Sequence, residues 1–480
     1  MSGQGNAMFS LREAAALIPG ATVIGDDNVT FERVSTDSRS AGPGDLFVAI
    51  KGERFDAHDF LADVAARNVT AALVSRAPQD WNVPALRVKD TRVGLGALAR
   101  GWRRKFGMPL VAVTGSNGKT TVKEMIASIF AAAVGADARL ATAGNFNNDI
   151  GLPLTLFRLN AAHRLAVVEL GMNHPGETSL LAKIAEPTVA VVNNAQREHQ
   201  EFMATVEAVA LEHASVIHAL NPDGVAVFPA DDAFASIWRV AATGNRIVDF
   251  ALNSDERTTE AAVTGRFDGK LLSVDTPQGH VEITLQVLGN HNAHNALAAT
   301  SAALAAGVSL DAIKRGLESF QPVKGRLQVK RAILGALAGA TVIDDTYNSN
   351  PDSMRAAIDV LASQAAPRVL VMGDMGEVGE EGPAFHREVG AYAAERGIDA
   401  LFALGAASVD AVNAFNASAS KQTAAHFGDV TEMVAALERA GYGSNATYLA
   451  KGSRFMKMER VVDALTTSQQ SAAGSAPAAH

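Results

Sequence analysis

The sequence predicts an α/β protein built from three domains. Its 480 residues, of which 48% are apolar, are enough for three domains at ~150 residues each, every one with its own core. Short apolar runs of strand length alternate with longer stretches of helical periodicity, which is typical of mostly parallel sheets covered by helices. One apolar run leads into a glycine-rich turn and a further helical pattern, and the rest of the prediction is organised around that turn.

Composition and charge exclude several functional classes. The net charge is -9 and no basic block stands out, which argues against a general affinity for nucleic acid. The absence of cysteine excludes disulfides and thiolate metal sites and suits a reducing cytoplasm. No run of about 18 apolar residues could span a membrane, and Arg12 and Glu13 interrupt the N-terminal apolar stretch, so we expect no signal peptide. We therefore expect a cytoplasmic monomer that does not insert into membranes.

Residues 1–108 form the first predicted unit, with strands at 46–50 and 71–74 and helices at 59–67 and 92–105. The unit also contains a polar loop, S-T-D-S-R, that brings hydroxyls, a carboxylate and a guanidinium together. Such a loop could hold the polar groups of a sugar nucleotide, but a capping and turn cluster would have the same composition. His58, in a polar loop after the first strand, is interpreted as structural.

The glycine-rich turn lies within residues 111–123, V-A-V-T-G-S-N-G-K-T-T-V-K, and begins the second unit. We expect a buried strand at 110–113, a backbone that bends close to an anion at Gly115 and Gly118, and a helix from about Thr120. The free N–H groups and positive dipole end of that helix would then face the anion. This is the arrangement of a phosphate-binding loop.

Lys119 would add a positive charge to this loop, and the hydroxyl of Thr120 could bind Mg²⁺. The spacing departs from the common pattern G-x-x-x-x-G-K-[ST], because Val113 occupies the place of the first glycine. G-K-T by itself also occurs at ordinary helix starts. The order of strand, loop and helix favours the phosphate-binding interpretation.

Two later apolar runs of the second unit, at 166–170 and 188–192, also predict buried strands. Polar residues follow both, and ligands of open α/β sheets gather beyond the carboxyl ends of strands. Glu169 and His199 are therefore candidate Mg²⁺ ligands near the nucleotide. Taken singly, each could instead cap a loop.

The end of the second unit, which extends to residue 322, has a different pattern. Residues 260–287 alternate in the manner of strands, with turn signals that predict an antiparallel hairpin patch. G-N-H-N-A-H-N at 289–295 then precedes a predicted helix at 296–306. Amides and imidazoles gathered there suggest recognition of a polar ring such as adenine, although helix capping would explain one or two of them.

Residues 323–466 predict a third, Rossmann-like α/β unit. Its strands are expected at 341–344, 368–372, 400–404 and 447–450. Three polar segments follow strands directly, so we expect a site at one edge of this sheet. Arg326, in the connection between the units, could reach a phosphate in the second unit. The tail at 467–480 is rich in Ser, Ala, Gln, Gly and Pro, which predicts disorder.

These segments resemble the Mur ligase family over nearly the whole chain. The resemblance lies in the order and spacing of T-G-S-N-G-K-T-T at 114–121, E-L-G-M-N at 169–173, the His199 loop, G-N-H-N-x-x-N-A at 289–296, K-G-R at 324–326, D-D-T-Y-N-S-N-P at 344–351, G-D-M-G-E at 373–377 and K-G-S-R at 451–454. Within the family, the chain most resembles the last ligase of peptidoglycan precursor synthesis. That likeness lies in S-T-D-S-R at 35–39, D-L-F-V-A-I-K-G at 45–52 and G-N-F-N-N-D-I-G-L-P at 144–153.

The resemblance implies a small N-terminal domain for a UDP-sugar substrate (1–108), a central ATP-binding domain (109–322) with a parallel sheet and a small antiparallel patch, and a C-terminal ligase domain (323–466). It also implies an ADP-forming amide ligase of peptidoglycan precursor synthesis. ATP would phosphorylate the carboxylate of UDP-N-acetylmuramoyl-tripeptide, and D-alanyl-D-alanine would attack the acyl phosphate. Mg²⁺ would assist the phosphoryl transfer, and closure of the third domain would exclude water from the acyl phosphate.

The same resemblance implies roles for individual residues. For ATP these are Gly115, Ser116, Asn117, Gly118, Lys119, Thr120 and Thr121 at the phosphates, Asn290, His291 and Asn295 at the base, and Arg326 and Asp345 at phosphate and ribose. Mg²⁺ would be placed by Thr120, Glu169 and His199, and the catalytic set would be Lys119, Glu169, His199 and Arg326. The substrate would meet Asp37, Ser38 and Arg39 at its uridine end, Asn145 and Asn147 nearer the reacting centre, and Tyr347 and Asn348.

Three other functions share some of these features. An ATPase or kinase of another class would share the phosphate loop but would give no reason for the first unit. A different amide ligase, either an earlier Mur enzyme or one similar to folylpolyglutamate synthase, is the main alternative. A noncatalytic nucleotide-binding protein would not need the full set of Lys119, Thr120, Glu169 and His199.

The sequence departs from the family in one place. Many members carry, a little over ten residues beyond the metal histidine, a lysine whose carbamate helps to hold a second Mg²⁺. That place falls on His213 here, and residues 204–220 contain no lysine. Imidazole forms no stable carbamate, and Mg²⁺ prefers oxygen ligands. We therefore expect no carbamylation and a second Mg²⁺ held by phosphates, water and Glu212; alternatively, His213 is a plain helix residue.

Overall fold

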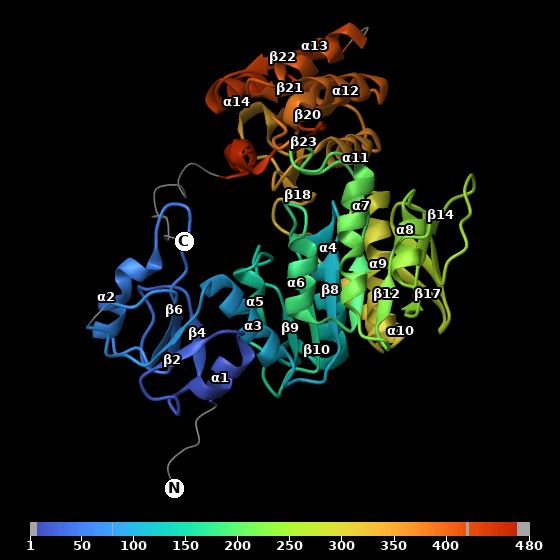
Figure 1. Cartoon of the computed structure of the whole chain (residues 1–480). Helices are drawn as coiled ribbons and strands as arrows, with labels where there is room; N and C mark the ends of the chain where they lie inside the picture. Colours follow the sequence, from blue (N-terminus) through green and yellow to red (C-terminus); the bar gives the residue numbers. More distant parts are fainter. Residues whose placement is uncertain (1–6, 79, 419–421, 468–480) are drawn as a thin grey trace.

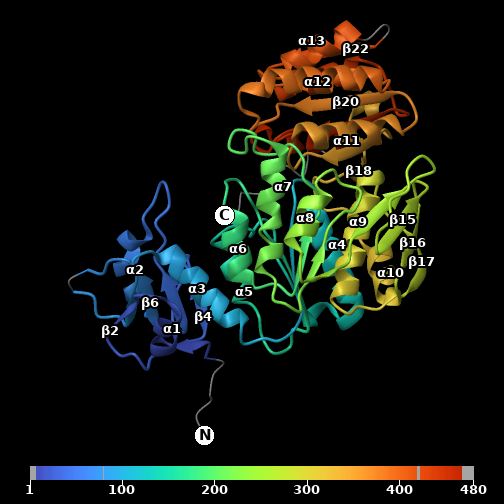
Figure 2. The same cartoon turned by 45° about the vertical axis from the view of Figure 1, so that its right-hand side comes forward.

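The computed structural model describes residues 7–78, 80–418 and 422–467, which form three α/β domains in succession along the chain (Figure 1). The predicted disordered tail lies outside these residues except for Thr467. Figure 2 shows the C-terminal domain above the central domain and the N-terminal domain beside it. The predicted fold class is confirmed, whereas the boundaries after residues 108 and 322 stay predictions.

The N-terminal domain is built on a five-stranded sheet in the order β2-β7-β6-β5-β4, parallel except for β2. A short antiparallel pair, β1 with β3, lies beside it. The strands are β1 (Phe9–Ser10), β2 (Thr22–Ile24), β3 (Thr30–Phe31), β4 (Arg33–Ser35), β5 (Asp45–Val48), β6 (Ala71–Val74) and β7 (Ala85–Arg87), and the helices are α1 (Leu11–Leu17), α2 (Leu61–Ala66) and α3 (Thr91–Arg103).

The central domain contains a parallel six-stranded sheet in the order β13-β12-β11-β8-β10-β9. Its strands are β8 (Leu110–Thr114), β9 (Arg139–Ala141), β10 (Leu165–Glu169), β11 (Val189–Val192), β12 (Val225–Val227) and β13 (Arg246–Ile247). Both faces are covered, so its strands are almost entirely apolar: Val111 and Val113 of β8 enter one core, while Leu110 and Ala112 enter the other.

The predicted antiparallel patch is present as a second sheet, in which β15, β16 and β17 are antiparallel neighbours and β14 runs parallel to β15. These strands are β14 (Phe250–Asn253), β15 (Val263–Phe267), β16 (Leu271–Thr276) and β17 (Gly279–Thr284). The helices of the domain are α4 (Lys119–Val134), α5 (Gly151–Leu156), α6 (Glu177–Ala185), α7 (Val206–Ala214), α8 (Ala235–Ala241), α9 (Asn290–Ala305) and α10 (Leu310–Ser319).

The C-terminal domain has a six-stranded sheet in the order β18-β19-β23-β20-β21-β22, parallel except for β18. Its strands are β18 (Gln328–Arg331), β19 (Thr341–Asp345), β20 (Arg368–Gly373), β21 (Ala400–Leu404), β22 (Thr423–Phe427) and β23 (Thr447–Lys451). Its helices are α11 (Pro351–Ala362), α12 (Gly382–Glu395), α13 (Val409–Ser418), α14 (Val430–Arg439) and α15 (Glu459–Thr466).

The structure corrects the predicted start of one helix. Helix α9 begins at Asn290 and not at residue 296, because Gly289, at φ 87°, provides the turn into it. The amides and imidazoles of 290–295 therefore lie within its first turns. None of the helices in the described ranges is long and apolar enough to cross a membrane.

Candidate active site

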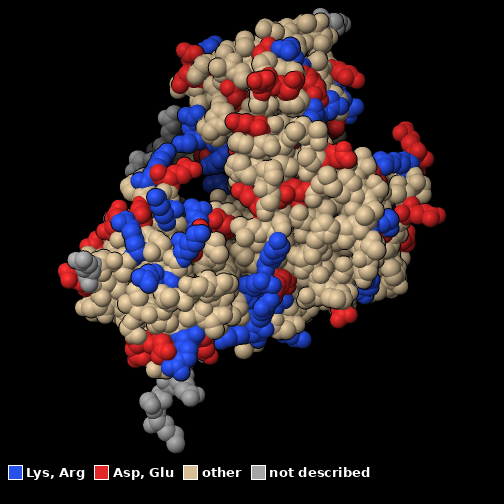
Figure 3. All heavy atoms as spheres, viewed as in Figure 1, with Lys and Arg blue, Asp and Glu red and all other residues tan. Residues whose placement is uncertain are grey.

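A cleft of about 1070 Å³ lies where the three domains meet, and it contains the phosphate loop. The N-terminal domain contributes Arg92 to its lining, the central domain contributes Lys119 and Glu169, and the C-terminal domain contributes Asp345 and Lys451. On the face drawn in Figure 3, Lys and Arg side chains gather around a hollow between the N-terminal and C-terminal domains, with Asp and Glu side chains among them. The cleft lining includes both acidic and basic side chains, so an anionic ligand would depend on local positive charge such as that of Lys119 and Arg326.

The phosphate loop joins β8 to α4 in the predicted order, and glycine is required at its second bend. Gly118 has φ 80°, and a Cβ there would lie 2.5 Å from Asn295 Oδ1 and 2.7 Å from Asn193 Nδ2. Asn193 Nδ2 donates to the carbonyl of Asn117 and to Asn295 Oδ1, both at 2.8 Å. Asn295 thus contacts the loop from behind, and its own Nδ2 donates to Asn292.

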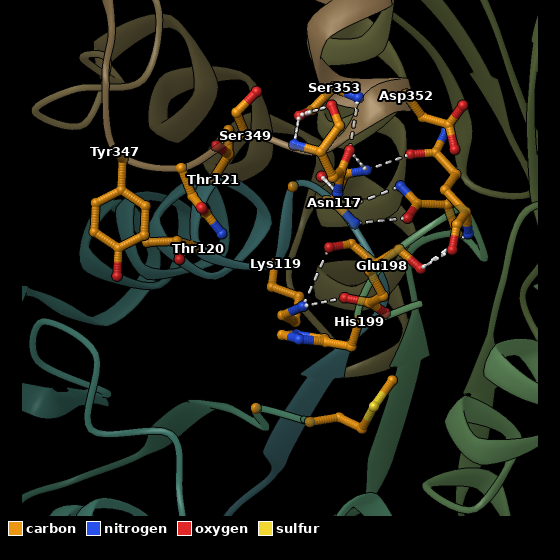
Figure 4. Close-up of a pocket in the computed structure, with 18 of the residues that line it drawn as sticks. Asn117, Lys119, Thr120, Thr121, Glu198, His199, Tyr347, Ser349, Asp352 and Ser353 are labelled. Carbon is orange, nitrogen blue, oxygen red and sulfur yellow. Dashed lines mark hydrogen bonds and ion pairs between the residues drawn. The ribbon is translucent and has the colours of Figure 1, made fainter. Parts of the chain in front are cut away.

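Lys119, the first residue of α4, is turned back onto the loop. Its Nζ donates to the carbonyls of Gly115 at 2.5 Å and Ser116 at 3.2 Å, and it lies 3.4 Å from Glu198 Oε2. Figure 4 shows Lys119, Glu198 and His199 on one side of the pocket and Thr120 and Tyr347 on the other. The ammonium group is therefore held beside the helix N-terminus, where an anion would bind.

Glu198 is a buried carboxylate that the sequence analysis did not select. Burial alone would raise its pKa, but the charge of Lys119 and the hydrogen bond from His213 outweigh burial and lower the pKa to about 2. His213 Nε2 lies 2.8 Å from Glu198 Oε1, and His213 Nδ1 lies 3.0 Å from Thr114 Oγ1. His213 lies in α7 and is fully buried, and its ring contacts Thr114 and Glu198 in addition to its place in the helix.

Glu212, which we expected to help hold a second Mg²⁺, is directed elsewhere, so that expectation is wrong. Its carboxylate accepts hydrogen bonds from the backbone N–H groups of Gly176 and Thr178, both at 2.9 Å. These groups lie at the start of α6. Capping that helix uses both oxygens of Glu212.

The three predicted Mg²⁺ ligands all line the cleft, and the two oxygen ligands among them, Thr120 and Glu169, fit the chemistry of the ion. Glu169 is 3% exposed; its Oε1 accepts from Asn147 at 2.8 Å, and its Oε2 is buried without a partner. The hydroxyl of Thr120 and the ring of His199 also line the cleft. No three His, Asp or Glu side chains of the described residues converge tightly enough to hold a metal by themselves. Mg²⁺ commonly completes its shell with phosphate and water, so an orphaned carboxylate oxygen and a hydroxyl suffice.

The residues predicted to meet the nucleotide base lie at the start of α9. Asn290 is exposed, His291 is partly buried, and both line the cleft together with Asn295. Burial lowers the pKa of His291 to about 4, more than the nearby carboxylate of Asp345 raises it. His291 is therefore neutral at pH 7 and has one donor and one acceptor nitrogen.

The C-terminal domain reaches the phosphate loop through Arg326, whose Nη2 donates to Thr120 Oγ1 at 3.0 Å. Its guanidinium lies 4.2 Å from the centroid of the Tyr347 ring. Nearby, Lys451 Nζ donates to Asp345 Oδ2 at 2.7 Å and to the carbonyl of Asn348 at 2.9 Å. The residues of this domain that were predicted to contact ligands all line the cleft: Arg326, Asp345, Tyr347 and Asn348.

The predicted substrate residues are divided between two places. Asn145 and Asn147 line the cleft. Asp37 and Arg39 form an ion pair of 2.8 Å in the loop after β4, outside the cleft lining, with Ser38 between them. The hydrogen bonds from Arg39 lower the pKa of Asp37 to about 2. The structure therefore does not bring the 37–39 loop to the phosphate loop, and its role with the uridine end of the substrate stays a prediction.

A clamp between the central and C-terminal domains was missed by sequence reasoning. Arg197, in the loop after β11, reaches Asp352 at 2.6 Å and Glu388 at 2.7 Å in the C-terminal domain. Asn117 of the phosphate loop exchanges hydrogen bonds of 3.0 and 3.3 Å with Asn350. The partners are 155 or more residues apart, and a single sequence carries no signal for such pairs.

Models of known protein families match three parts of the chain. The Mur ligase middle domain matches residues 113–303, the Mur ligase, glutamate ligase domain matches 325–454, and the Mur ligase family, catalytic domain matches 30–103. The cleft residues of the central and C-terminal domains described above lie almost entirely within the first two of these matches.

Curated proteins and solved structures match nearly the full length of the chain. The UDP-N-acetylmuramoyl-tripeptide--D-alanyl-D-alanine ligases of Haemophilus influenzae and Escherichia coli are 41% and 40% identical to it; the alignments cover 94% and 91% of this chain and 97% and 94% of those proteins. The crystal structure of MurF from Acinetobacter baumannii has a TM-score of 0.84 at 36% identity, over 94% of this chain and 96% of that one. MurF from Thermotoga maritima in complex with ADP has a TM-score of 0.78 at 24% identity, over 90% of this chain and 96% of that one, which shows likeness of fold.

Proposed function

The chain belongs to the Mur ligase family, and on that premise we propose that it joins D-alanyl-D-alanine to UDP-N-acetylmuramoyl-tripeptide, converting ATP to ADP and phosphate. The observation that carries the proposal is the extent of the match. It covers 97% of the H. influenzae ligase at 41% identity, so nearly the whole length of that relative has a counterpart here. Peptidoglycan precursor synthesis is the corresponding pathway.

The proposed reaction has two steps. An oxygen of the terminal carboxylate of the tripeptide attacks the γ-phosphorus of ATP, and ADP leaves. The amine of the dipeptide then attacks the acyl carbon, and phosphate leaves with the carboxylate oxygen that attacked in the first step. The overall products are the amide, ADP and phosphate.

The phosphate loop supports the first step because it provides positive charge without a large rearrangement. The N–H groups at the start of α4 and the ammonium of Lys119 would stabilise the charge on the transferred group. Arg326 already reaches Thr120 from the opposite domain, so it would add a second charge to the same group. Thr120, Glu169 and His199 would hold Mg²⁺, which when bound neutralises charge on the phosphates.

The position of the cleft supports the second step. An acyl phosphate is readily hydrolysed, so water must be excluded while the amine attacks. Residues of all three domains line the cleft, and the contacts of Arg197 and Asn117 hold the C-terminal domain against the phosphate loop. The C-terminal domain would therefore act as a cover for the reacting centre.

The direct test measures ADP release by the purified protein with UDP-N-acetylmuramoyl-tripeptide, using a diaminopimelate and a lysine form in parallel. D-alanyl-D-alanine, glutamate or no acceptor is then added. We expect rapid ADP release only with D-alanyl-D-alanine, accompanied by a product whose mass equals the two substrates minus water. Rapid release with glutamate would indicate an amide ligase with a different acceptor, and release without any acceptor would assign the chain to the ATPases.

A further inference from the structure

The further inference concerns the buried pair Glu198 and His213 beside the phosphate loop, and it rests on the proposed function. Glu198 is 5% exposed, and His213 is fully buried in α7. Neither residue has a role in the reaction described above. A carboxylate is rarely buried unless it is paired, so the partners of Glu198 indicate what holds it in the cleft wall.

His213 fixes the orientation of this carboxylate. Its Nε2 faces Glu198 Oε1 at 2.8 Å, and an ionised carboxylate only accepts hydrogen bonds, so Nε2 carries a proton. Its Nδ1 lies 3.0 Å from the hydroxyl of Thr114, the last residue of β8. Both ring nitrogens are therefore satisfied. Such a histidine, held by the strand before the phosphate loop, places the carboxylate relative to that loop.

The second oxygen of Glu198 faces the cleft. Glu198 lines the cleft, and its Oε2 lies 3.4 Å from Lys119 Nζ, which also donates to two loop carbonyls. If the lysine binds the γ-phosphate of ATP, its charge is shared between the phosphate and Oε2. A buried carboxylate oxygen would then have only part of a counter-charge beside the negatively charged phosphates, which is unfavourable. A divalent cation between the carboxylate and the phosphates removes that cost.

We propose that Glu198 Oε2 is a ligand of a second divalent cation in the ATP-bound enzyme, and that His213 is a positioning residue for it. No lysine in α7 could carry a carbamate, and Glu212 caps α6. Glu198 approaches the cleft from the neighbouring loop instead. It supplies the anionic oxygen that this chain lacks at position 213.

A Mn²⁺ titration followed by electron paramagnetic resonance, with a non-hydrolysable ATP analogue bound, tests the proposal. We expect two bound Mn²⁺ per wild-type chain and one per Glu198→Gln chain, because the amide keeps the size of the side chain but not its charge. Glu212→Gln is the matched control and should retain two. A wild type with one site, or a Glu198→Gln variant with two, would overturn the proposal and leave Glu198 as a counter-ion of Lys119.

The role of His213 is tested by comparing His213→Leu with His213→Gln. Loss of the hydrogen bond to a metal-ligating carboxylate weakens metal binding by about 10- to 100-fold, so Leu should weaken the second Mn²⁺ by that factor. Gln should restore much of the affinity, because its amide N–H can donate to Glu198. Equal affinity in both variants would show that His213 does not position the ligand. Thermal unfolding identifies any variant that fails to fold. If a His213 variant fails to fold, the Mn²⁺ count of Glu198→Gln alone tests the proposal.

Two further measurements separate this inference from the proposed function. Activity of the wild type should be the same in degassed buffer with and without bicarbonate; dependence on bicarbonate would mean that a lysine carbamate supplies the charge. Formation of the amide product by the wild type tests the proposed function independently of the Mn²⁺ count. A wild type that makes the product but binds one Mn²⁺ contradicts only the inference.

Discussion

At the scale of single residues, the charge of Lys119 is the feature of the cleft with the most direct effect on chemistry. Its ammonium lies at the start of α4, where developing negative charge on the γ-phosphoryl group would be stabilised. The other lysine near the start of this helix, Lys123, is buried and donates to the carbonyl of Thr142. Lys119 therefore has no substitute in the loop.

We predict that Lys119→Ala lowers the turnover of ligation by about 100- to 1,000-fold or more, as removal of a group that stabilises transition-state charge commonly does. Steady-state ADP release measures this effect. Lys183→Ala, which removes an exposed lysine in the last turn of α6, is the control and should behave like the wild type. A Lys119→Ala enzyme with more than about a tenth of wild-type turnover would remove the residue from the catalytic set.

His58 illustrates a residue whose role is structural. Its Nδ1 faces Asp56 Oδ1 at 2.6 Å, and its Nε2 accepts a hydrogen bond from the backbone N–H of Ser75 at 2.9 Å. The hydrogen bond from the backbone N–H of His58 lowers the pKa of Asp56 to about 2, although burial opposes it; the His58 ring and Arg76 act in the same direction. The interpretation of His58 as structural is supported by these contacts.

The low pKa of Asp56 predicts a pH-dependent contribution to stability. A carboxyl group whose pKa is lower in the folded state stabilises the fold above its unfolded pKa of about 4, and this contribution is lost as the pH falls toward 2. We expect Asp56→Asn to lower the urea midpoint of the N-terminal domain at pH 7, with a smaller difference from wild type at pH 3. A difference that grows on acidification would show that the pKa of Asp56 is not lowered.

At the scale of elements, the strand, loop and helix around the phosphate site were predictable because their signals are local. The apolar run of β8, the glycines and the helical pattern of α4 all lie within 25 residues. The start of α9 was placed six residues late, because Asn and His favour caps and loops on local grounds. In this structure 290–295 are helical, since Asn292, Ala293 and Asn295 are buried under the phosphate loop and the sheets.

The pairs that complete the site were not predictable from one sequence. Arg197 and Asp352 are separated by 155 residues, so neither residue's neighbours indicate the other. Glu198 and His213 are only 15 residues apart, but a bend at His199, at φ 46°, and the loop that follows bring them together. Periodicity detects regular elements and not the geometry of such loops.

The close contact of α9 with the phosphate loop predicts a severe effect at Gly118. Gly118→Ala adds a Cβ within 2.5 Å of Asn295 and strains a left-handed conformation, the latter costing roughly 1–2 kcal/mol. We expect it to weaken binding of a fluorescent ATP analogue more than tenfold. Gly176→Ala, at φ 90° and ψ -13° with nothing within 4 Å of the added Cβ, is the matched control, because Gly176 precedes α6 in the same left-handed conformation.

The control should lose stability on heating but keep normal affinity for the analogue, since it carries the strain without the contact. Equal affinity in both variants would show that the packing of Asn295 under the loop does not control nucleotide binding.

At the scale of the whole molecule, Arg197 links the central domain to the C-terminal domain. This side chain pairs with Asp352 and Glu388 and lies 5.3 Å from the centroid of the Phe385 ring. The loop that carries it also carries Glu198 and His199. The contacts of Arg197 therefore join the C-terminal domain to the loop that places Glu198 and His199 in the cleft lining.

We predict that Arg197→Gln weakens this contact by roughly 2 kcal/mol. This value is near the lower end of the free-energy cost of removing one partner of a hydrogen-bonded charge pair, because these side chains are partly exposed. Small-angle scattering should show a larger radius of gyration, and turnover should fall more than affinity for the UDP-sugar substrate. Arg387→Gln, which breaks an exposed pair with Asp410 inside the C-terminal domain, should change neither. An unchanged radius of gyration in Arg197→Gln would show that other contacts hold the domain.

The central claim is that the cleft activates a carboxylate by phosphorylation and protects the acyl phosphate until an amine attacks it. The most direct measurement uses UDP-N-acetylmuramoyl-tripeptide labelled with ¹⁸O in its terminal carboxylate, with ATP and D-alanyl-D-alanine. Mass spectrometry of the released phosphate should find one oxygen from the carboxylate in each phosphate formed, because the oxygen that attacks the γ-phosphorus leaves with it. Unlabelled phosphate formed in step with the amide product would contradict the account, because the γ-phosphoryl group would then have been transferred to water.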